Sequence, residues 1–485
     1  MSDLKLYARR IGLVGITNAL VSLSVILLLP ILTKNLSIED YGIWVQANVT
    51  ITLLPAIIPL GLSYTMVRFL AAEKRREKKQ EGFYSIFIVV ILMSVIASLL
   101  LFLLAEPIAS KLFNNNIEAT RAISLVIFIE CLNNPCISFF RTFLRMKVYS
   151  TVLVVKTYLN VLLVSFFVLS GQGVMGALTA LLITSAVIFL LMLYLIIKDI
   201  GIAVPRFERM REYLAFGLPT IPGNLSSWII NSSSCYVISI LLGIAYVGYY
   251  SPGYSLGNIN LMFMGPFSVM LSAVMARYYE ENDLDSIKTI LNYSTKYFLA
   301  IAIPSTFGLA LLSKSLLMIL SPPQIALNGY LITPFVALSA LFYGMYVFFA
   351  EIIAVKKKTA IMGRIWVAAA ILSLGLNLIL IPRFGIIGGA ASILITYAFA
   401  LAFGIYYSRR YIPVNVDLFF VAKSILSSIL MSLIIVYFQP SGLMQVLAVT
   451  GACAIFYCIA LILLKGFNRD ELRFLKGLMG IGAHR

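Results

Sequence analysis

Residues Gly173–Lys198 read GVMGALTALLITSAVIFLLMLYLIIK, and residues Gly385–Arg410 read GIIGGAASILITYAFALAFGIYYSRR. The second stretch begins 212 residues after the first (385 − 173), and the two align without a gap. Both are apolar, both are long enough to cross a bilayer, and both end in positive charge. A repeat of this length, with neighbours that also repeat, predicts a membrane protein built from two similar lobes. The positions identical to the second stretch are Gly173, Gly176, Leu182, Ile183, Thr184, Ala186 and Tyr194.

The composition indicates a membrane protein throughout. Of the 485 residues, 61% are hydrophobic and only 12% are charged, whereas a soluble domain has about 25% charged residues. Apolar runs of about 20 residues recur along the whole chain. The sequence therefore predicts an all-α polytopic membrane protein with about 14 transmembrane helices. The predicted spans are 11–32, 43–63, 83–105, 119–140, 151–170, 174–197, 217–242, 252–275, 294–312, 331–354, 365–382, 388–408, 418–438 and 443–464.

Basic residues alternate sharply between the connections. The N-terminal tail, every second loop and the C-terminal tail hold 30 of the 37 Lys and Arg residues. The opposite side holds five: Lys34, Lys111, Arg121, Lys314 and Arg383. By the positive-inside rule, both termini are cytoplasmic. The net charge of +17 is then mostly a matter of topology, and it does not indicate binding to nucleic acid.

Other spans repeat as well. Spans 1 and 2 align with spans 7 and 8 at an offset of 206, which pairs Asn18 with Asn224 and Gly42 with Gly248. Six spans separate the copies, so the two halves have the same orientation and form a parallel repeat. We predict an N-terminal lobe at 1–200 (spans 1–6), a C-terminal lobe at 201–412 (spans 7–12), and two extra spans with a cytoplasmic tail at 413–485.

Span 7 carries a polar stripe. Asn224, Ser227, Asn231 and Ser234 recur at helical spacing. Small polar groups of this kind either join neighbouring helices or line a wet central cavity. Prolines such as Pro59 in span 2 and Pro219, Pro222 and Pro266 in spans 7 and 8 predict bent helices.

Charged residues inside the spans are candidates for function because they are costly there. Glu130 lies in the middle of span 4, and Lys156 lies about two turns into span 5. The two would either pair with each other or leave Lys156 to bind an anion. Further cations lie near the inner ends of the spans: Arg68, Arg141, Arg145, Arg277 and Arg364.

The sequence disfavours several other kinds of chemistry. The five cysteines fall in apolar runs, His484 is the only histidine, and no cluster has metal-ligand spacing, so we predict neither a metal site nor a cofactor. Glu39 and Asp40 resemble the paired carboxylates of membrane glycosyltransferases. The outer loops are too short to hold an acceptor, so we interpret this pair as the turn that begins span 2. We predict no catalytic residue and no enzyme activity.

Two segments resemble the polysaccharide-exporter flippases of the multidrug/oligosaccharidyl-lipid/polysaccharide (MOP) transporter superfamily. They are LLPILTKNLSIEDYGIW at Leu28–Trp44 with IPLGLSYTMVRFLA at Ile58–Ala71, and Tyr213–Asn258 at the start of the second lobe. The resemblance implies alternating-access transport of an oligosaccharide on a polyprenyl phosphate or pyrophosphate, from the cytoplasmic to the outer leaflet of the plasma membrane. Where many members have an acidic residue in span 7, this chain has Ser234-Cys235-Tyr236, which makes Glu130 the candidate for ion coupling.

With this function, the expected partners are lipid-linked oligosaccharide, membrane lipid, the coupling ions H+ or Na+, and polysaccharide-assembly proteins. The alternatives are a cation-coupled multidrug antiporter of the same superfamily and a flippase for a peptidoglycan-precursor lipid. We expect Asn18, Asn224 and Asn231 to contact sugar hydroxyls. We expect phosphate to be held by Arg68, Arg145, Lys156, Arg277 and Arg364.

Overall fold

The chain forms a bundle of membrane helices. The computed structural model describes all residues except Met1, Lys74, Val414, Asn415 and 468–485, and none of the described residues lies in a strand. Lys74, the tail cations from Arg469 onward and His484 lie outside the described residues. Within the described part, twelve helices are long and apolar enough to cross a membrane, and the bent pair α2 and α3 makes a thirteenth span. The predicted all-α polytopic fold is confirmed.

The first half of the chain contributes eight helices. In chain order they are α1 (Ser2–Asn35), α2 (Ile38–Ile57), α3 (Leu62–Leu70), α4 (Arg76–Leu103), α5 (Ala105–Leu112), α6 (Ile117–Thr142), α7 (Met146–Leu169) and α8 (Gly173–Ile200).

The second half begins with two short segments, α9 (Met210–Gly217) and the 3-10 helix η1 (Leu218–Thr220), where Pro219 interrupts predicted span 7. The rest consists of α10 (Ile221–Leu242), α11 (Ile244–Gly257), η2 (Asn258–Phe263), α12 (Met264–Glu280), α13 (Leu284–Leu320), α14 (Pro323–Gly329), α15 (Ile332–Val355), α16 (Thr359–Phe384), α17 (Ile386–Arg409), α18 (Leu418–Phe438) and α19 (Leu443–Leu463).

The predicted eighth span, 252–275, is not one regular helix. Its residues run through α11, the 3-10 segment η2 and α12. This is where the count of about 14 spans differs from the thirteen spans that the helix lengths and hydropathy support. The chain is helical without a break from Ile244 to Glu280, but α11, with 14 residues, and α12, with 17, are each too short to count as a span alone.

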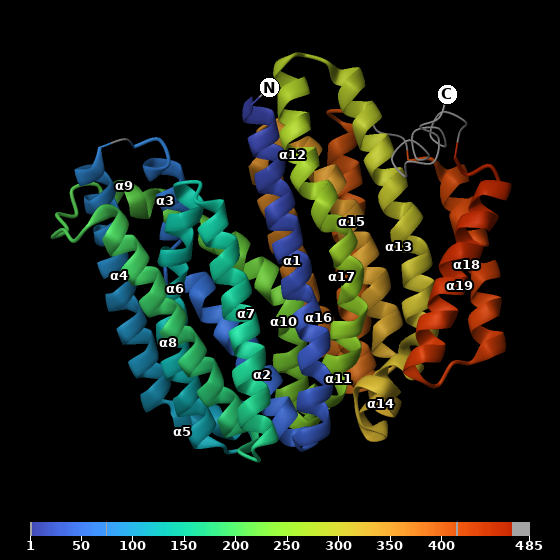
Figure 1. Cartoon of the computed structure of the whole chain (residues 1–485), viewed down its shortest axis with the longest axis horizontal. Helices are drawn as coiled ribbons and strands as arrows, with labels where there is room; N and C mark the ends of the chain where they lie inside the picture. Colours follow the sequence, from blue (N-terminus) through green and yellow to red (C-terminus); the bar gives the residue numbers. More distant parts are fainter. Residues whose placement is uncertain (1, 74, 414–415, 468–485) are drawn as a thin grey trace.

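Two groups of helices converge at one end of the molecule and diverge toward the end that carries the N-terminus (Figure 1). Helices α4, α6 and α8 lie in one group, α13, α15 and α17 lie in the other, and α18 and α19 stand beside α13 at the edge (Figure 1). The helix α9 crosses to the first group, where the Thr65 hydroxyl of α3 donates to the Tyr213 carbonyl at 3.0 Å. Residues 210–217 thus contact the first half, and the lobe boundaries at residues 200 and 412 stay a prediction.

The converging ends are held by a reciprocal contact between α2 and α11. A side chain at Gly42 would collide with the carbonyl of Ile244, and a side chain at Gly248 would collide with the carbonyl of Ile38. Both pairs are related by the repeat offset of 206 (248 − 42 and 244 − 38). Each glycine therefore lets the backbone of the other half approach, as a pseudo-twofold axis between the halves requires.

Two more hydrogen bonds tie the halves together at this end. The Thr33 hydroxyl donates to the Leu320 carbonyl at 2.9 Å, and Lys34 Nζ donates to the Ile319 carbonyl at 2.8 Å. Beside them, Ser37 caps the N-terminus of α2, because its hydroxyl accepts from the Asp40 backbone N–H at 3.0 Å. Glu39 and Asp40 lie in the first turn of α2. Negative charge there stabilises a helix through its interaction with the helix dipole.

Candidate functional site

The bend between α2 and α3 shapes the first cavity. The two helices meet at 48°, because Pro59 has no N–H to offer the carbonyl of Pro55 and so breaks the helical ladder. The Asn134 amide of α6 donates to that carbonyl at 3.4 Å. Gly61 then adopts φ +69°, and a side chain there would collide with the Gly217 carbonyl. Beyond the bend, α3 packs against α6 and α9 (Figure 1).

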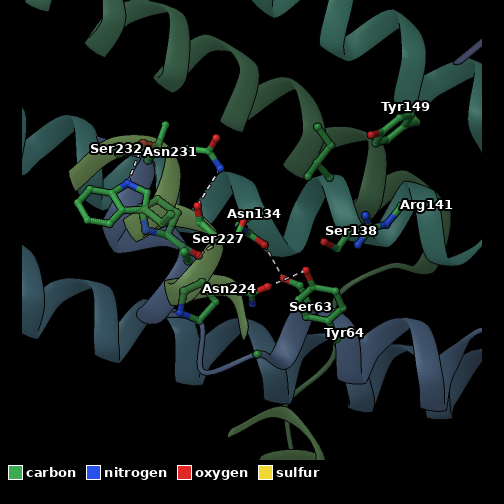
Figure 2. Close-up of a pocket in the computed structure, with 17 residues that line it drawn as sticks. Ser63, Tyr64, Asn134, Ser138, Arg141, Tyr149, Asn224, Ser227, Asn231 and Ser232 are labelled. Carbon is green, nitrogen blue, oxygen red and sulfur yellow. Dashed lines mark hydrogen bonds between the residues drawn. The ribbon is translucent and has the colours of Figure 1, made fainter. Parts of the chain in front are cut away.

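We call this cavity between the two halves the polar chamber. It has a volume of about 550 Å³, and it lies between α2, α3, α6 and α7 on one side and α10 on the other. Its wall is mostly hydroxyl, amide and aromatic side chains (Figure 2). The polar and aromatic residues that line it are Thr52, Ser63, Tyr64, Asn134, Ser138, Arg141, Tyr149, Asn224, Ser227, Trp228, Asn231 and Ser232.

Hydrogen bonds cross the polar chamber from one half to the other. The Tyr64 hydroxyl donates to Asn224 Oδ1 at 3.1 Å, and Trp228 Nε1 donates to Thr52 Oγ1 at 3.3 Å. Within the first half, the Ser63 hydroxyl donates to Asn134 Oδ1 at 2.5 Å (Figure 2). The two bonds between the halves are both exposed. A ligand with hydroxyl groups would therefore replace them at little cost in free energy.

A second cavity, the ion-pair chamber, adjoins the first, because Asn231 and Ser232 line both. It has a volume of about 510 Å³ and lies among α1, α2, α6, α7, α8, α10 and α11. Lys156 Nζ donates to Glu130 Oε2 at 2.6 Å, and the Ser185 hydroxyl donates to Glu130 Oε1 at 2.5 Å. Both oxygens of the carboxylate are thus occupied, which is the arrangement expected of an ion pair within a membrane.

The ion-pair chamber also contains polar atoms without a partner. Asn160 Oδ1 and Thr184 Oγ1 are buried and have no hydrogen-bond partner among the described residues. Both line the chamber: Asn160 is four residues after Lys156 on α7, and Thr184 directly precedes Ser185, which donates to Glu130. Unpaired polar atoms of this kind are costly in a dry interior, so the chamber suits water or a polar ligand.

The polar stripe of span 7 divides between two roles. Asn224, Ser227 and Asn231 line the polar chamber. Ser234 is buried instead, and its hydroxyl donates to Asn377 Oδ1 of α16 at 3.1 Å. The two interpretations of the stripe therefore apply to different residues: three face a cavity, and the fourth joins two helices.

Four of the nine predicted site residues line the chambers. They are Asn224 and Asn231 of α10, and the pair Glu130 and Lys156. Asn231 is held from both sides, since its Oδ1 accepts from the Tyr397 hydroxyl at 2.7 Å and its amide donates to the Ser227 carbonyl at 2.8 Å. Lys156 was expected either to pair with Glu130 or to remain available to an anion, and the structure pairs it.

The other five predicted residues do not line either chamber. Arg145 forms an ion pair with Asp199, and Arg277 pairs with Glu281 at 2.9 Å on the surface of α12. Asn18, Arg68 and Arg364 are exposed, outside the residues that line the two chambers.

Arg141 is the cation that the polar chamber does contain. It lies in the last turn of α6, is exposed, and forms no ion pair within the described residues. The sequence named it only among several arginines at inner helix ends. Trp228 and Tyr64 were missed altogether, although the four-residue spacing of Trp228 from Asn224 on span 7 places it near the same polar face.

Comparison with known proteins assigns the chain to a family. The family model described as polysaccharide biosynthesis protein matches residues 31–322. The chain belongs to this polysaccharide biosynthesis family. Agl15 of Haloferax volcanii, a probable low-salt glycan biosynthesis flippase, is 18% identical over 228 residues. That match spans about half of each protein, 47% of this chain and 48% of the relative.

Solved structures share the fold of this polysaccharide biosynthesis family member. The lipid II flippase MurJ in an inward closed conformation superposes with a TM-score of 0.77 over 96% of this chain and 99% of its own, at 18% identity. An inward-facing multidrug resistance transporter of the MOP superfamily superposes with a TM-score of 0.65, over 80% of this chain and 93% of its own, also at 18% identity. The chain therefore shares the fold of these two transporters, and it is a multi-pass membrane protein.

Proposed function

We propose that the protein is an alternating-access flippase that moves a lipid-linked oligosaccharide from the cytoplasmic to the outer leaflet. The observation that carries the proposal is the polar chamber, which lies between the two halves and is lined by hydroxyl, amide and aromatic groups with one arginine. Such a wall matches a sugar chain, whose hydroxyls both donate and accept hydrogen bonds. The membership in a polysaccharide biosynthesis family supports the same substrate class.

In this proposal the head group and the lipid tail of the substrate follow different routes. The polyprenyl chain stays in the bilayer, since it is as apolar as the lipid around it. Asn224 and Asn231 contact sugar hydroxyls, and the Arg141 guanidinium holds the phosphate by charge-assisted hydrogen bonds. Arg141 takes the role of binding phosphate that we had expected of Arg68, Arg145, Lys156, Arg277 and Arg364.

The state of the structure supports a cytoplasmic entrance. The contact of Gly42 and Gly248 with the opposite half closes the end away from the N-terminus, and the helices diverge toward the N-terminal end (Figure 1). With cytoplasmic termini, as the basic loops predict, the polar chamber receives the head group from the cytoplasmic leaflet. Breaking the contact between α2 and α11 then opens the path to the outer leaflet.

The proposal is tested by leaflet exchange in vesicles that contain the purified protein. A fluorescent oligosaccharide on a polyprenyl phosphate is placed in both leaflets, and a membrane-impermeant quencher reports how fast the inner pool becomes accessible. We expect exchange with the wild-type protein. Arg141→Gln should slow it at least about tenfold, because losing a charged partner costs about 2 kcal/mol. The matched control is Arg383→Gln, an exposed arginine at the end of α16 outside both chambers.

The same vesicles separate the alternatives. Exchange of a peptidoglycan-precursor lipid but not of the oligosaccharide lipid would indicate the precursor flippase. Cation-driven uptake of a lipophilic cationic dye with neither lipid exchanged would indicate a multidrug antiporter. New glycosidic bonds in the recovered lipid would indicate an enzyme. Any of these three results would overturn the proposal.

A further inference from the structure

The charges that line the two chambers carry an inference about the substrate. Among the described lining residues, the charged side chains are Arg141 in the polar chamber and Glu130 and Lys156 in the ion-pair chamber. We propose that the transport path selects glycans carried on a single phosphate, and that Glu130 sets this selectivity by neutralising Lys156. The inference rests on the flippase function proposed above and names the substrate class of its site.

Lys156 is not available to a substrate phosphate while Glu130 is ionised. Its ammonium group lies 2.6 Å from the carboxylate, and the two side chains are only 29% and 16% exposed. Ser185 donates to the other carboxylate oxygen at 2.5 Å and fixes its position. A phosphate that took Lys156 would leave the Glu130 carboxylate unpaired in a low-dielectric site, which is strongly unfavourable. The pair therefore contributes no net charge to the path.

Arg141 is then the one cation, among the described lining residues, that is open to an anion. It forms no ion pair within the described part of the chain, and Ser138 lies one helical turn before it in the same wall. A guanidinium group binds one phosphate group in a forked geometry. A glycan on a polyprenyl phosphate brings a single phosphodiester charge, which Arg141 balances. The pyrophosphate form brings a second charge that has no partner.

The sugar part of the substrate follows from the same wall. The groups around Arg141 are neutral, including Asn134, Asn224, Ser227 and Trp228. Neutral donors and acceptors satisfy sugar hydroxyls, but they do not balance a carboxylate or sulfate on the sugar. We therefore expect a glycan that is neutral apart from its phosphate link.

The experiment compares two lipids with the same neutral oligosaccharide, one on a polyprenyl monophosphate and one on the pyrophosphate. Binding to the purified full-length protein is measured by competition with a labelled monophosphate lipid, and exchange is measured in vesicles. We expect the wild-type protein to prefer the monophosphate lipid by about tenfold, which corresponds to about 1.4 kcal/mol. Glu130→Gln frees the charge of Lys156, so it should abolish or reverse that preference.

Two variants separate charge from local damage. The double variant Glu130→Gln, Lys156→Gln keeps the net charge of the path, so it should keep the monophosphate preference. The control Glu118→Gln removes a carboxylate from the exposed start of the same helix α6, outside both chambers, and should leave the preference unchanged. If Glu130→Gln does not fold, the wild-type preference and the double variant still decide the question.

The outcomes distinguish this inference from the function on which it rests. Equal binding and exchange of both lipids by the wild-type protein would overturn the charge selection and leave the flippase function intact. A monophosphate preference that Glu130→Gln leaves unchanged would overturn the role of Glu130. Failure of the wild-type protein to exchange either lipid would overturn the flippase function itself.

Discussion

At the scale of single residues, the Glu130–Lys156 pair joins α6 to α7 inside the bundle. Each charge would be costly in the membrane without the other. Together with Ser185 of α8, the pair links three helices at one point. Because the pair lies in the wall of the ion-pair chamber, a change in its charge changes the electrostatic potential inside that chamber.

The pair should behave as a unit in stability. We predict that Glu130→Gln or Lys156→Met alone lowers the free energy of unfolding by about 3 kcal/mol, since each leaves an uncompensated partner. Combining the two should recover most of the loss. Thermal unfolding of the four proteins in one detergent measures this cycle. Additive losses in the double variant would show that the two groups do not depend on each other.

The sequence identified the charged residues that are costly to bury in a membrane better than it identified the residues that line a cavity. Glu130 and Lys156 were found because a charge in the middle of an apolar run needs a reason. Arg141 and Arg145 could not be told apart, because both lie near the short connection between spans 4 and 5. In the structure, Arg141 belongs to the last turn of α6 and Arg145 precedes the start of α7. Which face each presents depends on where the helices end, and this is poorly encoded in sequence patterns.

At the scale of helices, the contact of α2 with α11 closes one end of the molecule. It depends on backbone approaching backbone, which only glycine permits at Gly42 and Gly248. The sequence paired these two glycines by the repeat, without showing that they lie at the interface. A repeat in sequence shows which positions of the two halves are equivalent. It does not show that each of these positions contacts the opposite half.

Adding a methyl group at this contact should open it. We predict that Gly248→Ala weakens the closed end by about 2 kcal/mol, the usual cost of overpacking. A cysteine at Ile38 should then react faster with a membrane-impermeant thiol reagent applied from outside. The control is Gly451→Ala in α19, where an added side chain meets nothing within 4 Å. Unchanged reactivity at residue 38 would contradict a gate at this contact.

The bends in the helices were partly predictable. Proline in span 2 predicted a bent helix, and the chain does turn by 48° between α2 and α3. The direction of that bend was not predictable, because it depends on Gly61 and on the carbonyl of Gly217, more than 150 residues away (217 − 61 = 156). The sequence predicted a bend in span 8 from Pro266, but it did not predict the 3-10 segment η2 between α11 and α12.

At the scale of the whole molecule, the distribution of charge predicts how the protein is oriented in the membrane. The connections on the N-terminal end carry most of the basic residues, and the opposite end carries few. The bilayer and the potential across it favour that end in the cytoplasm. This orientation also places the diverging end of the bundle on the side where lipid-linked sugars are assembled in the proposed function.

Labelling of single cysteines in intact cells tests the orientation. In a cysteine-free background, a cysteine at Asn115, between α5 and α6, should react with an impermeant maleimide at once. A cysteine at Lys357, between α15 and α16, should react only after the membrane is permeabilised. Both positions are exposed. The reverse pattern would place the termini outside and would exclude the entrance proposed here.

The doubled arrangement of helices stays a prediction, and it rests on a repeat that recurs at many positions of the sequence. Two copies in the same orientation, each with six predicted spans, already indicated a path between two halves. The polar chamber is lined by five helices and the ion-pair chamber by seven, so no local sequence pattern contains either. Family membership supports the proposed substrate class, and the geometry indicates the residues proposed to bind it.

The most direct measurement of the account is leaflet exchange in one preparation whose outer end is locked and then released. Cysteines at Lys34 and Ile319, which lie on opposite halves and are joined by a 2.8 Å hydrogen bond, are bridged in vesicles by a reducible bis-thiosulfonate linker. We predict that exchange of the lipid-linked oligosaccharide stops when the bridge forms and returns when it is reduced. Exchange that continues through the locked protein would contradict alternating access between the two halves.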